Sequence, residues 1–208
     1  MKKFVGHEKE GLYDPANEHD ACGVGFVVDI KGRKSHQTVV DALTILKNLL
    51  HRGACGCEEN TGDGVGILIQ KPHKFFVREC KKIGIELPEE DQYGAGLVFL
   101  PTDAKQADRC QQIISGIVEE EGQVLLGWRD LPIDDSMLGP SAVAGEPDFK
   151  QVFIGRGEQI KDSSAFERKL YVIRKRAENT IWNSDLSEQE LFYVPSLSYR
   201  TFVYKGML

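Results

Sequence analysis

Two long amphipathic helical patterns, each set between short apolar runs, most strongly constrain how this chain of 208 residues can fold. The patterns span residues 103–121 and 164–182, and their apolar side chains recur at steps of three and four, which is typical of one buried helix face. Apolar runs that predict strands cover residues 93–100, 123–128, 150–154 and 190–194. The resulting order, β-α-β followed by β-α-β, is that of a ferredoxin-like subdomain with one shared sheet. The pattern predicts such an inserted α/β subdomain at about residues 90–195.

A second set of elements flanks this predicted subdomain. Val24–Ile30 is an apolar run that predicts a first strand, and Lys31-Gly32-Arg33 predicts a tight turn. Ser35 is placed to cap an amphipathic helix that ends at His51-Arg52-Gly53. The remaining elements that the pattern predicts are a strand at residues 65–70, a helix from Pro72 to Lys82 and a strand at residues 199–204 that returns to the first sheet.

A cysteine lies where the sequence changes abruptly from charged to apolar. A charged, turn-prone segment runs into Asp20-Ala21-Cys22-Gly23 and then into the apolar run that follows. One hypothesis is that the chain is cut between Ala21 and Cys22, which leaves Cys22 as an N-terminal nucleophile with its own α-amine as general base. The alternative is an inert, buried cysteine at the start of a strand.

The glycine-rich stretch at residues 53–64 allows two further interpretations. Thr61-Gly-Asp-Gly-Val-Gly66 lacks the GK[ST] ending of a phosphate loop and leads into a strand, so glycines that let backbone approach closely are favoured over a nucleotide site. Cys55-Gly-Cys57 is a conceivable metal ligand pair, but His51 gives no recognised ligand spacing with it.

Composition excludes several classes of protein. The net charge is −6 and the basic residues are scattered, which argues against nucleic-acid binding. The sequence has no apolar run of about 18 residues that would predict a membrane span, and its N-terminus lacks the apolar core of a signal peptide. Five cysteines without a CxxC pair fit a reducing compartment, so we expect a cytoplasmic protein.

Four stretches of the chain, in collinear order, resemble the N-terminal part of the glutamate synthase large subunit. They are GLYDPANEHDACGVGF at residues 11–26, NLLHRGACGCEENTGDGVGI at 48–67, PHKFF at 72–76 and SLSYRTFVYKGML at 196–208. This family opens with a class II glutamine amidotransferase domain of the N-terminal-nucleophile type, an αββα sandwich. The resemblance therefore implies an α+β fold of that type, present here in part, over residues 22–208.

The resemblance also implies roles for particular residues. Cys22 matches the catalytic cysteine, which is exposed when the propeptide, residues 1–21, is removed after Ala21. Arg52 and Gly53 match the family's Arg-Gly pair beside the nucleophile and glutamine; from the residues alone, Arg52 is equally well explained as a cation at a helix C-terminus. Cys55 and Cys57 are not the family's iron–sulfur ligands.

Glutamine is the substrate that the resemblance implies, with ammonia passed to 2-oxoglutarate in the intact synthase. FMN and an iron–sulfur cluster belong to that intact enzyme and not to this segment. The implied partners are the 2-oxoglutarate/FMN remainder of the large subunit and a small electron-transfer subunit or ferredoxin. The chain has no Arg-Phe-Ser-Thr segment and no Asn-Gly pair, which bind glutamine and form the oxyanion hole in the family. The alternative is therefore a truncated, catalytically incomplete folding or interaction module.

Overall fold

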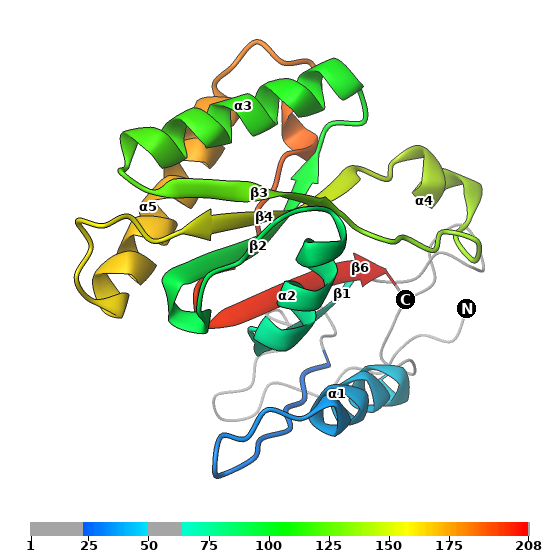
Figure 1. Ribbon diagram of the computed structural model, residues 1–208. Helices are drawn as coiled ribbons and strands as arrows, with labels where there is room; N and C mark the ends of the chain where they lie inside the picture. Colours follow the sequence, from blue (N-terminus) through cyan, green and yellow to red (C-terminus); the bar gives the residue numbers. More distant parts are fainter. Residues whose placement is uncertain (1–22, 50–63, 208) are drawn as a thin grey trace, which may run out of the picture. The chain divides into compact units, whose positions relative to one another are not determined.

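The computed structural model describes residues 23–49 and 64–207 (Figure 1). These residues fall into two compact units, Met1–Cys55 and Gly56–Leu208, and each is described by itself. In the described part of the first unit the regular element is helix α1 (His36–Asn48). The elements of the second unit, in chain order, are β1 (Gly64–Gln70), α2 (His73–Lys82), η3 (Glu90–Gln92), β2 (Tyr93–Leu100), α3 (Ala104–Glu120), β3 (Val124–Asp130), α4 (Pro140–Ala144), β4 (Asp148–Gly155), α5 (Ser163–Trp182), η4 (Gln189–Leu191), β5 (Leu197–Ser198) and β6 (Thr201–Met207).

A four-stranded antiparallel sheet forms the centre of the second unit. Its strand order is β3-β4-β2-β5, and β2 pairs with β4 along its whole length, from Tyr93 opposite Gly155 to Leu100 opposite Asp148. The strands predicted at 93–100, 123–128 and 150–154 are confirmed, although β3 begins one residue later and ends two residues later than predicted and β4 is longer at both ends. A register shift between Leu125 and Gly127 in β3 leaves Leu126 as the extra residue of a bulge.

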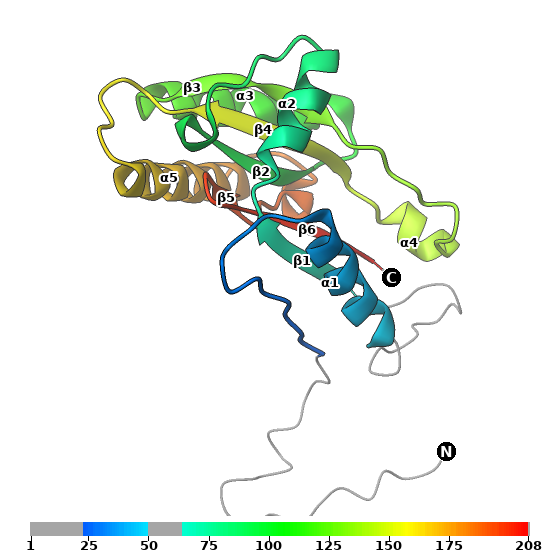
Figure 2. The ribbon, with the colours of Figure 1, turned by 60° about the horizontal axis from the view of Figure 1, so that its bottom comes forward.

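Both faces of this sheet are covered, which makes it an inner layer (Figures 1 and 2). Helices α3 and α5 pack on one face, against side chains that include Val98 and Val152. The opposite face carries Ala95, Leu97 and Phe153, which form a second core cluster with residues of α2 and β6. The inward side chains predicted for the two long helices are confirmed as buried: Ala107, Cys110, Ile114 and Ile117 in α3, and Phe166, Leu170, Ile173, Ala177 and Ile181 in α5.

The second sheet is an antiparallel ribbon of β1 and β6. Its register runs from Gly64 opposite Met207 to Gln70 opposite Thr201. The last strand therefore returns to the strand after the glycine-rich stretch, as the sequence predicts, although it begins at Thr201. Phe202 of β6 is fully buried against Phe76 of α2 in the second core cluster. The second unit thus has helices α3 and α5 on one face of the four-stranded sheet, and α2 with the β1–β6 ribbon on the other face. This is a mixed α+β arrangement with antiparallel sheets.

Two predicted strands are wrong. Val24–Ile30 forms no strand, and the side chains of Val24 and Ile30 are 89% and 99% exposed. A strand requires a hydrogen-bonding neighbour, and the described part of the first unit offers only a helix.

The chain at Glu190–Val194 is also not a strand. It begins in the 3-10 turn η4 and meets β2 through a single bridge between Tyr193 and Phe99. Regular pairing with β2 resumes only at β5. Pro195 separates these two contacts, and proline has no N–H group to donate to a sheet.

Candidate functional site

The residues that the sequence predicts for catalysis lie outside the described part of the chain. These residues are Ala21, Cys22, Arg52 and Gly53. The alternative metal ligands, Cys55 and Cys57, also lie outside the described residues. The structure describes the residues that flank them, Gly23 on one side and Leu49 on the other.

These two flanking residues lie against each other. A Cβ atom added at Gly23 would lie 2.9 Å from Cδ2 of Leu49, and one added at Gly25 would lie 2.5 Å from Cγ2 of Ile45. Both distances are well below the 3.5–4.0 Å of an ordinary carbon contact. The two glycines therefore allow the backbone after residue 22 to run close to the last turns of α1.

A tight turn reverses the chain between this backbone and α1. The amide of Gly32, whose φ is 69°, donates to the carbonyl of Asp29 at 2.8 Å, which confirms the predicted turn. Arg33 pairs with the Asp29 carboxylate at 2.9 Å and holds the pKa of that carboxyl below its usual range. The hydroxyl of Ser35 then accepts from the amide of Gln37 at 3.1 Å, so the predicted N-cap of α1 is confirmed.

The two cysteines in the described residues are unsuited to nucleophilic catalysis. Cys80 and Cys110 are fully buried in the two core clusters. Burial raises the pKa of each thiol to about 11, so both are neutral at pH 7. Within residues 23–49 and 64–207, no group of three or more His, Cys, Asp or Glu side chains is arranged to hold a metal ion.

A buried lysine ties the start of β2 to the end of β1. Lys71 is 0% exposed, and its ammonium donates to the carbonyls of Glu90 and Tyr93, the latter at 2.6 Å. The same ammonium lies 3.5 Å from the centroid of the Tyr93 ring. Burial raises the pKa of Tyr93, whose hydroxyl lies 3.0 Å from Nδ1 of His73. Sequence reasoning missed this cluster because no local pattern distinguishes Lys71 from a solvated lysine at a strand end.

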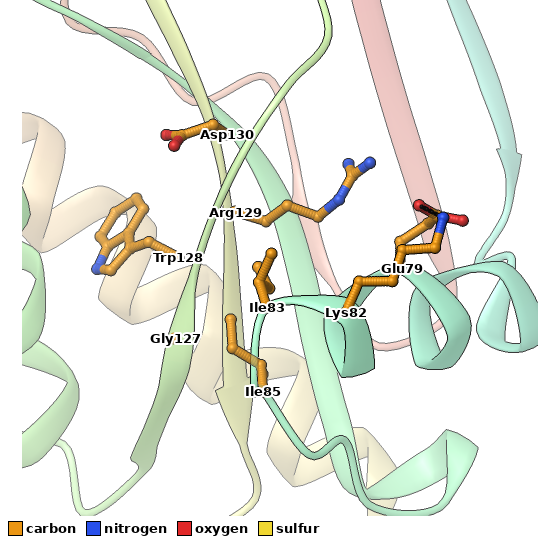
Figure 3. Close-up of a pocket in the computed structure, with 8 residues that line it drawn as sticks. All are labelled: Glu79, Lys82, Ile83, Ile85, Gly127, Trp128, Arg129 and Asp130. Atoms are coloured by element: carbon orange, nitrogen blue, oxygen red, sulfur yellow. Dashed lines mark hydrogen bonds and ion pairs between the residues drawn. The ribbon is translucent and has the colours of Figure 1, made fainter.

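A pocket of about 520 Å³ opens between the end of α2 and strand β3 (Figure 3). Ile83 and Ile85, which follow α2, form an apolar wall of the pocket. Arg129 extends from β3 toward Glu79. Trp128 and Asp130 point to the other side of the strand, as alternation along a strand requires. The sequence did not predict this pocket, because its walls are far apart along the chain.

A comparison with protein-family models matches residues 22–208 to the class-II glutamine amidotransferases. The chain belongs to this family. As a class-II glutamine amidotransferase domain it is an enzyme domain, and the match does not favour the alternative of a non-catalytic module.

The similar proteins are glutamate synthases. The chain is 46% identical over 199 residues to a glutamate synthase [NADPH] large chain of Bacillus subtilis, a match that covers 96% of this chain and 13% of the relative. It is 39% identical over 204 residues to a glutamate synthase [NADH] of Schizosaccharomyces pombe, covering 96% and 9%. With a ferredoxin-dependent glutamate synthase 2 of Arabidopsis thaliana the identity is 37% over 203 residues, covering 95% and 12%. This amidotransferase domain thus spans about an eighth or less of the length of these relatives.

None of the helices in the described residues is long and apolar enough to cross a membrane.

Proposed function

We propose that this chain is the glutaminase domain of a glutamate synthase and that it hydrolyses L-glutamine through a thioester on Cys22. The observation that carries the proposal is the collinear similarity to glutamate synthases over nearly the whole chain. The family match supports the position of the nucleophile as well, because it begins at residue 22 and leaves out residues 1–21, the predicted propeptide.

The α-amine of Cys22 supplies the base that the thiol needs. A cysteine thiol at pH 7 is only a few per cent thiolate, and an α-amine has a pKa near 8. Cleavage after Ala21 creates that amine, which takes the thiol proton as the sulfur attacks the carboxamide carbon of glutamine. The tetrahedral intermediate collapses to a thioester and releases ammonia, which carries away the proton that the amine held. Water then cleaves the thioester, which yields glutamate and the free thiol.

Arg52 and Gly53 belong to the same site in this proposal, where they support the nucleophile and glutamine. The contact between Gly23 and Leu49 supports this assignment. Cys22 is bonded to Gly23, and Arg52 follows Leu49 by three residues, so short stretches of chain connect both predicted residues to one contact.

The ammonia serves reductive amination of 2-oxoglutarate in the remainder of the large subunit. That part contains FMN and an iron–sulfur cluster in this proposal, with a small electron-transfer subunit or ferredoxin as electron donor. The described residues present no set of side chains suited to an iron–sulfur cluster. The proposed compartment is the cytoplasm.

The fold proposal is a four-layer αββα sandwich in which residues 90–195 form an inserted ferredoxin-like subdomain. The strand order β3-β4-β2-β5 and the crossovers through α3 and α5 support the insertion, because two split β-α-β units that share one antiparallel sheet give this order. The β1–β6 ribbon, which precedes and follows that segment in sequence, supports its placement as an insertion.

Two measurements on the protein made from its complete gene test the proposal. They are its intact mass and its release of ammonia from glutamine. We expect the purified enzyme to have lost residues 1–21 and to start at Cys22. Replacement of Cys22 by alanine should reduce ammonia release from glutamine to background, because no nucleophile remains.

Cys110→Ala is the matched control, since this thiol lies in the core and takes no part in the chemistry. It should be processed and should hydrolyse glutamine like the parent protein. Full glutaminase activity in a protein that retains Met1 would refute the role of the Cys22 amine.

A further inference from the structure

We propose that the pocket between α2 and β3 binds a small carboxylate with a short apolar chain, held through the guanidinium of Arg129. This site goes beyond the proposed glutaminase function and does not depend on it. Its lining residues all belong to the second unit.

Among the described residues that line the pocket, Arg129 is the cation that has no anionic partner at ion-pair distance. Glu79 pairs with Lys82 at 2.7 Å and with Arg78 at 2.8 Å. Asp130 pairs with Lys150. Within the described residues, by contrast, Arg129 has no carboxylate at ion-pair distance. A partly buried guanidinium in this position attracts an anion.

The guanidinium is held in place from the side of the core. Nη1 of Arg129 donates to Oε1 of Gln151 at 2.8 Å, and Gln151 is fully buried. Nε2 of Gln151 donates in turn to the hydroxyl of Tyr204 at 3.0 Å. The guanidinium carbon also lies 5.8 Å from the centroid of the Phe75 ring. This support orders the side chain before a ligand arrives, and its remaining N–H donors match the two oxygens of a carboxylate.

The walls of the pocket determine the rest of the ligand. Ile83 is a large apolar side chain that is 52% exposed, beside Ile85. A Cβ added at Gly127 would lie 2.6 Å from Cδ1 of Ile85, so the bulged strand can approach this wall because residue 127 is glycine. The volume of about 520 Å³ lies in the range of small-molecule sites. An apolar wall beside a guanidinium that has no ion pair within the described residues favours a carboxylate with a short hydrocarbon chain over an inorganic anion.

An NMR titration of the ¹⁵N-labelled protein tests this site with butanoate as the probe. We expect saturable shifts of the Arg129 Nε–H and Gly127 amide signals, with a Kd that is roughly millimolar for a ligand of this size. Arg129→Met should weaken butanoate binding by about tenfold or more, because the charge-assisted bonds are lost. Arg168→Met, which removes an exposed arginine on α5, is the matched control and should leave binding unchanged.

Further probes separate the parts of the proposal. Ile83→Ala removes an exposed apolar side chain from the pocket wall and leaves no cavity in the core. It should therefore reduce the affinity for butanoate by a several-fold larger factor than the affinity for acetate. Butylammonium, which has the same chain and the opposite charge, should not compete. The proposal is overturned if Arg129→Met, with an otherwise parental spectrum, binds butanoate as before, or if phosphate binds as tightly as butanoate. If Arg129→Met fails to fold, Arg129→Lys must weaken butanoate several-fold, and unchanged affinity in that variant would also overturn it.

Discussion

At the scale of single residues, two glycines determine how closely other segments pack against the inner sheet. Gly94 and Gly96 of β2 face neighbouring chain so closely that a Cβ added at Gly96 would lie 2.6 Å from the carbonyl oxygen of Ser196. A Cβ at Gly94 would lie 2.9 Å from Cδ2 of Leu170, which is fully buried in α5. The approach of α5 and β5 to β2 therefore depends on the absence of side chains at these two positions.

Two glycine-to-alanine changes should have opposite effects on stability. Gly94→Ala should lower the free energy of unfolding by about 1–3 kcal/mol, because the new methyl group overlaps the buried Leu170 side chain. Gly116→Ala should raise it by about 0.5–1 kcal/mol, because this residue is inside α3 with nothing within 4 Å of its added Cβ. Urea unfolding of both variants measures the difference, and equal effects would contradict the packing described for β2 and α5.

At the scale of elements, α3 and α5 are joined at one end by charges. The Glu121 carboxylate, at the C-terminal end of α3, pairs with Lys169 and Arg176 of α5, each at 2.7 Å. The hydrogen bond from Lys169, followed by that from Arg176, lowers the pKa of Glu121 below its ordinary value of 4.5. A carboxyl group whose folded-state pKa is lowered stabilises the fold above its ordinary pKa and loses that contribution as pH falls through the lowered value.

This sign predicts the pH dependence of a Glu121→Gln variant. The variant should be less stable than the parent protein at pH 7 by less than about 1 kcal/mol, because the ion pairs are partly exposed to water. The difference should shrink as the pH falls below 4.5 through the lowered pKa of Glu121. Chemical unfolding at a series of pH values measures it, with Glu119→Gln at an exposed site of the same helix as control. A difference that grows toward acid would contradict the sign.

At the scale of the whole second unit, Lys71 links the β1–β6 ribbon to the inner sheet. Its backbone amide donates to the carbonyl of Arg200 at 2.8 Å, while its ammonium donates to the carbonyl of Tyr93 at the start of β2. A lysine with no exposed surface is uncommon and requires such partners. The stacking of ribbon on sheet is thus maintained by a polar contact as well as by the aromatic cluster around Phe76.

Removal of this ammonium should loosen the joint between the two sheets. Lys71→Met should lower the free energy of unfolding by about 2–4 kcal/mol, because the buried carbonyl of Tyr93 and the partly buried carbonyl of Glu90 lose a donor. Hydrogen exchange should increase most in β1 and β6. Lys74→Met, at an exposed position on α2, should change neither quantity. Parental stability in Lys71→Met would mean that the ammonium does not support the layers.

Much of the fold follows from the sequence because its signals are local. Asp103 and Asp162 accept amide hydrogen bonds at the starts of α3 and α5, and the apolar spacing within each helix identifies the buried face. From the residues alone, Cys22 is a candidate nucleophile beside the alternative of an inert, buried cysteine, and the family resemblance favours the nucleophile. Cys22 and Arg52 lie outside the described residues. Their roles therefore stay proposals that rest on the family.

The tertiary structure decided what depends on distant partners. Val24–Ile30 has the composition of a strand but no neighbouring strand among the described residues, and Pro195 divides the last contacts of β2 into a bridge and a short strand. The burial of Lys71, and the lack of a carboxylate at ion-pair distance from Arg129 among the described residues, are equally invisible in a local window. Helix periodicity depends on residues within a turn or two of each other, whereas sheet pairing, buried charge and pocket walls depend on which distant segments the folded chain brings together.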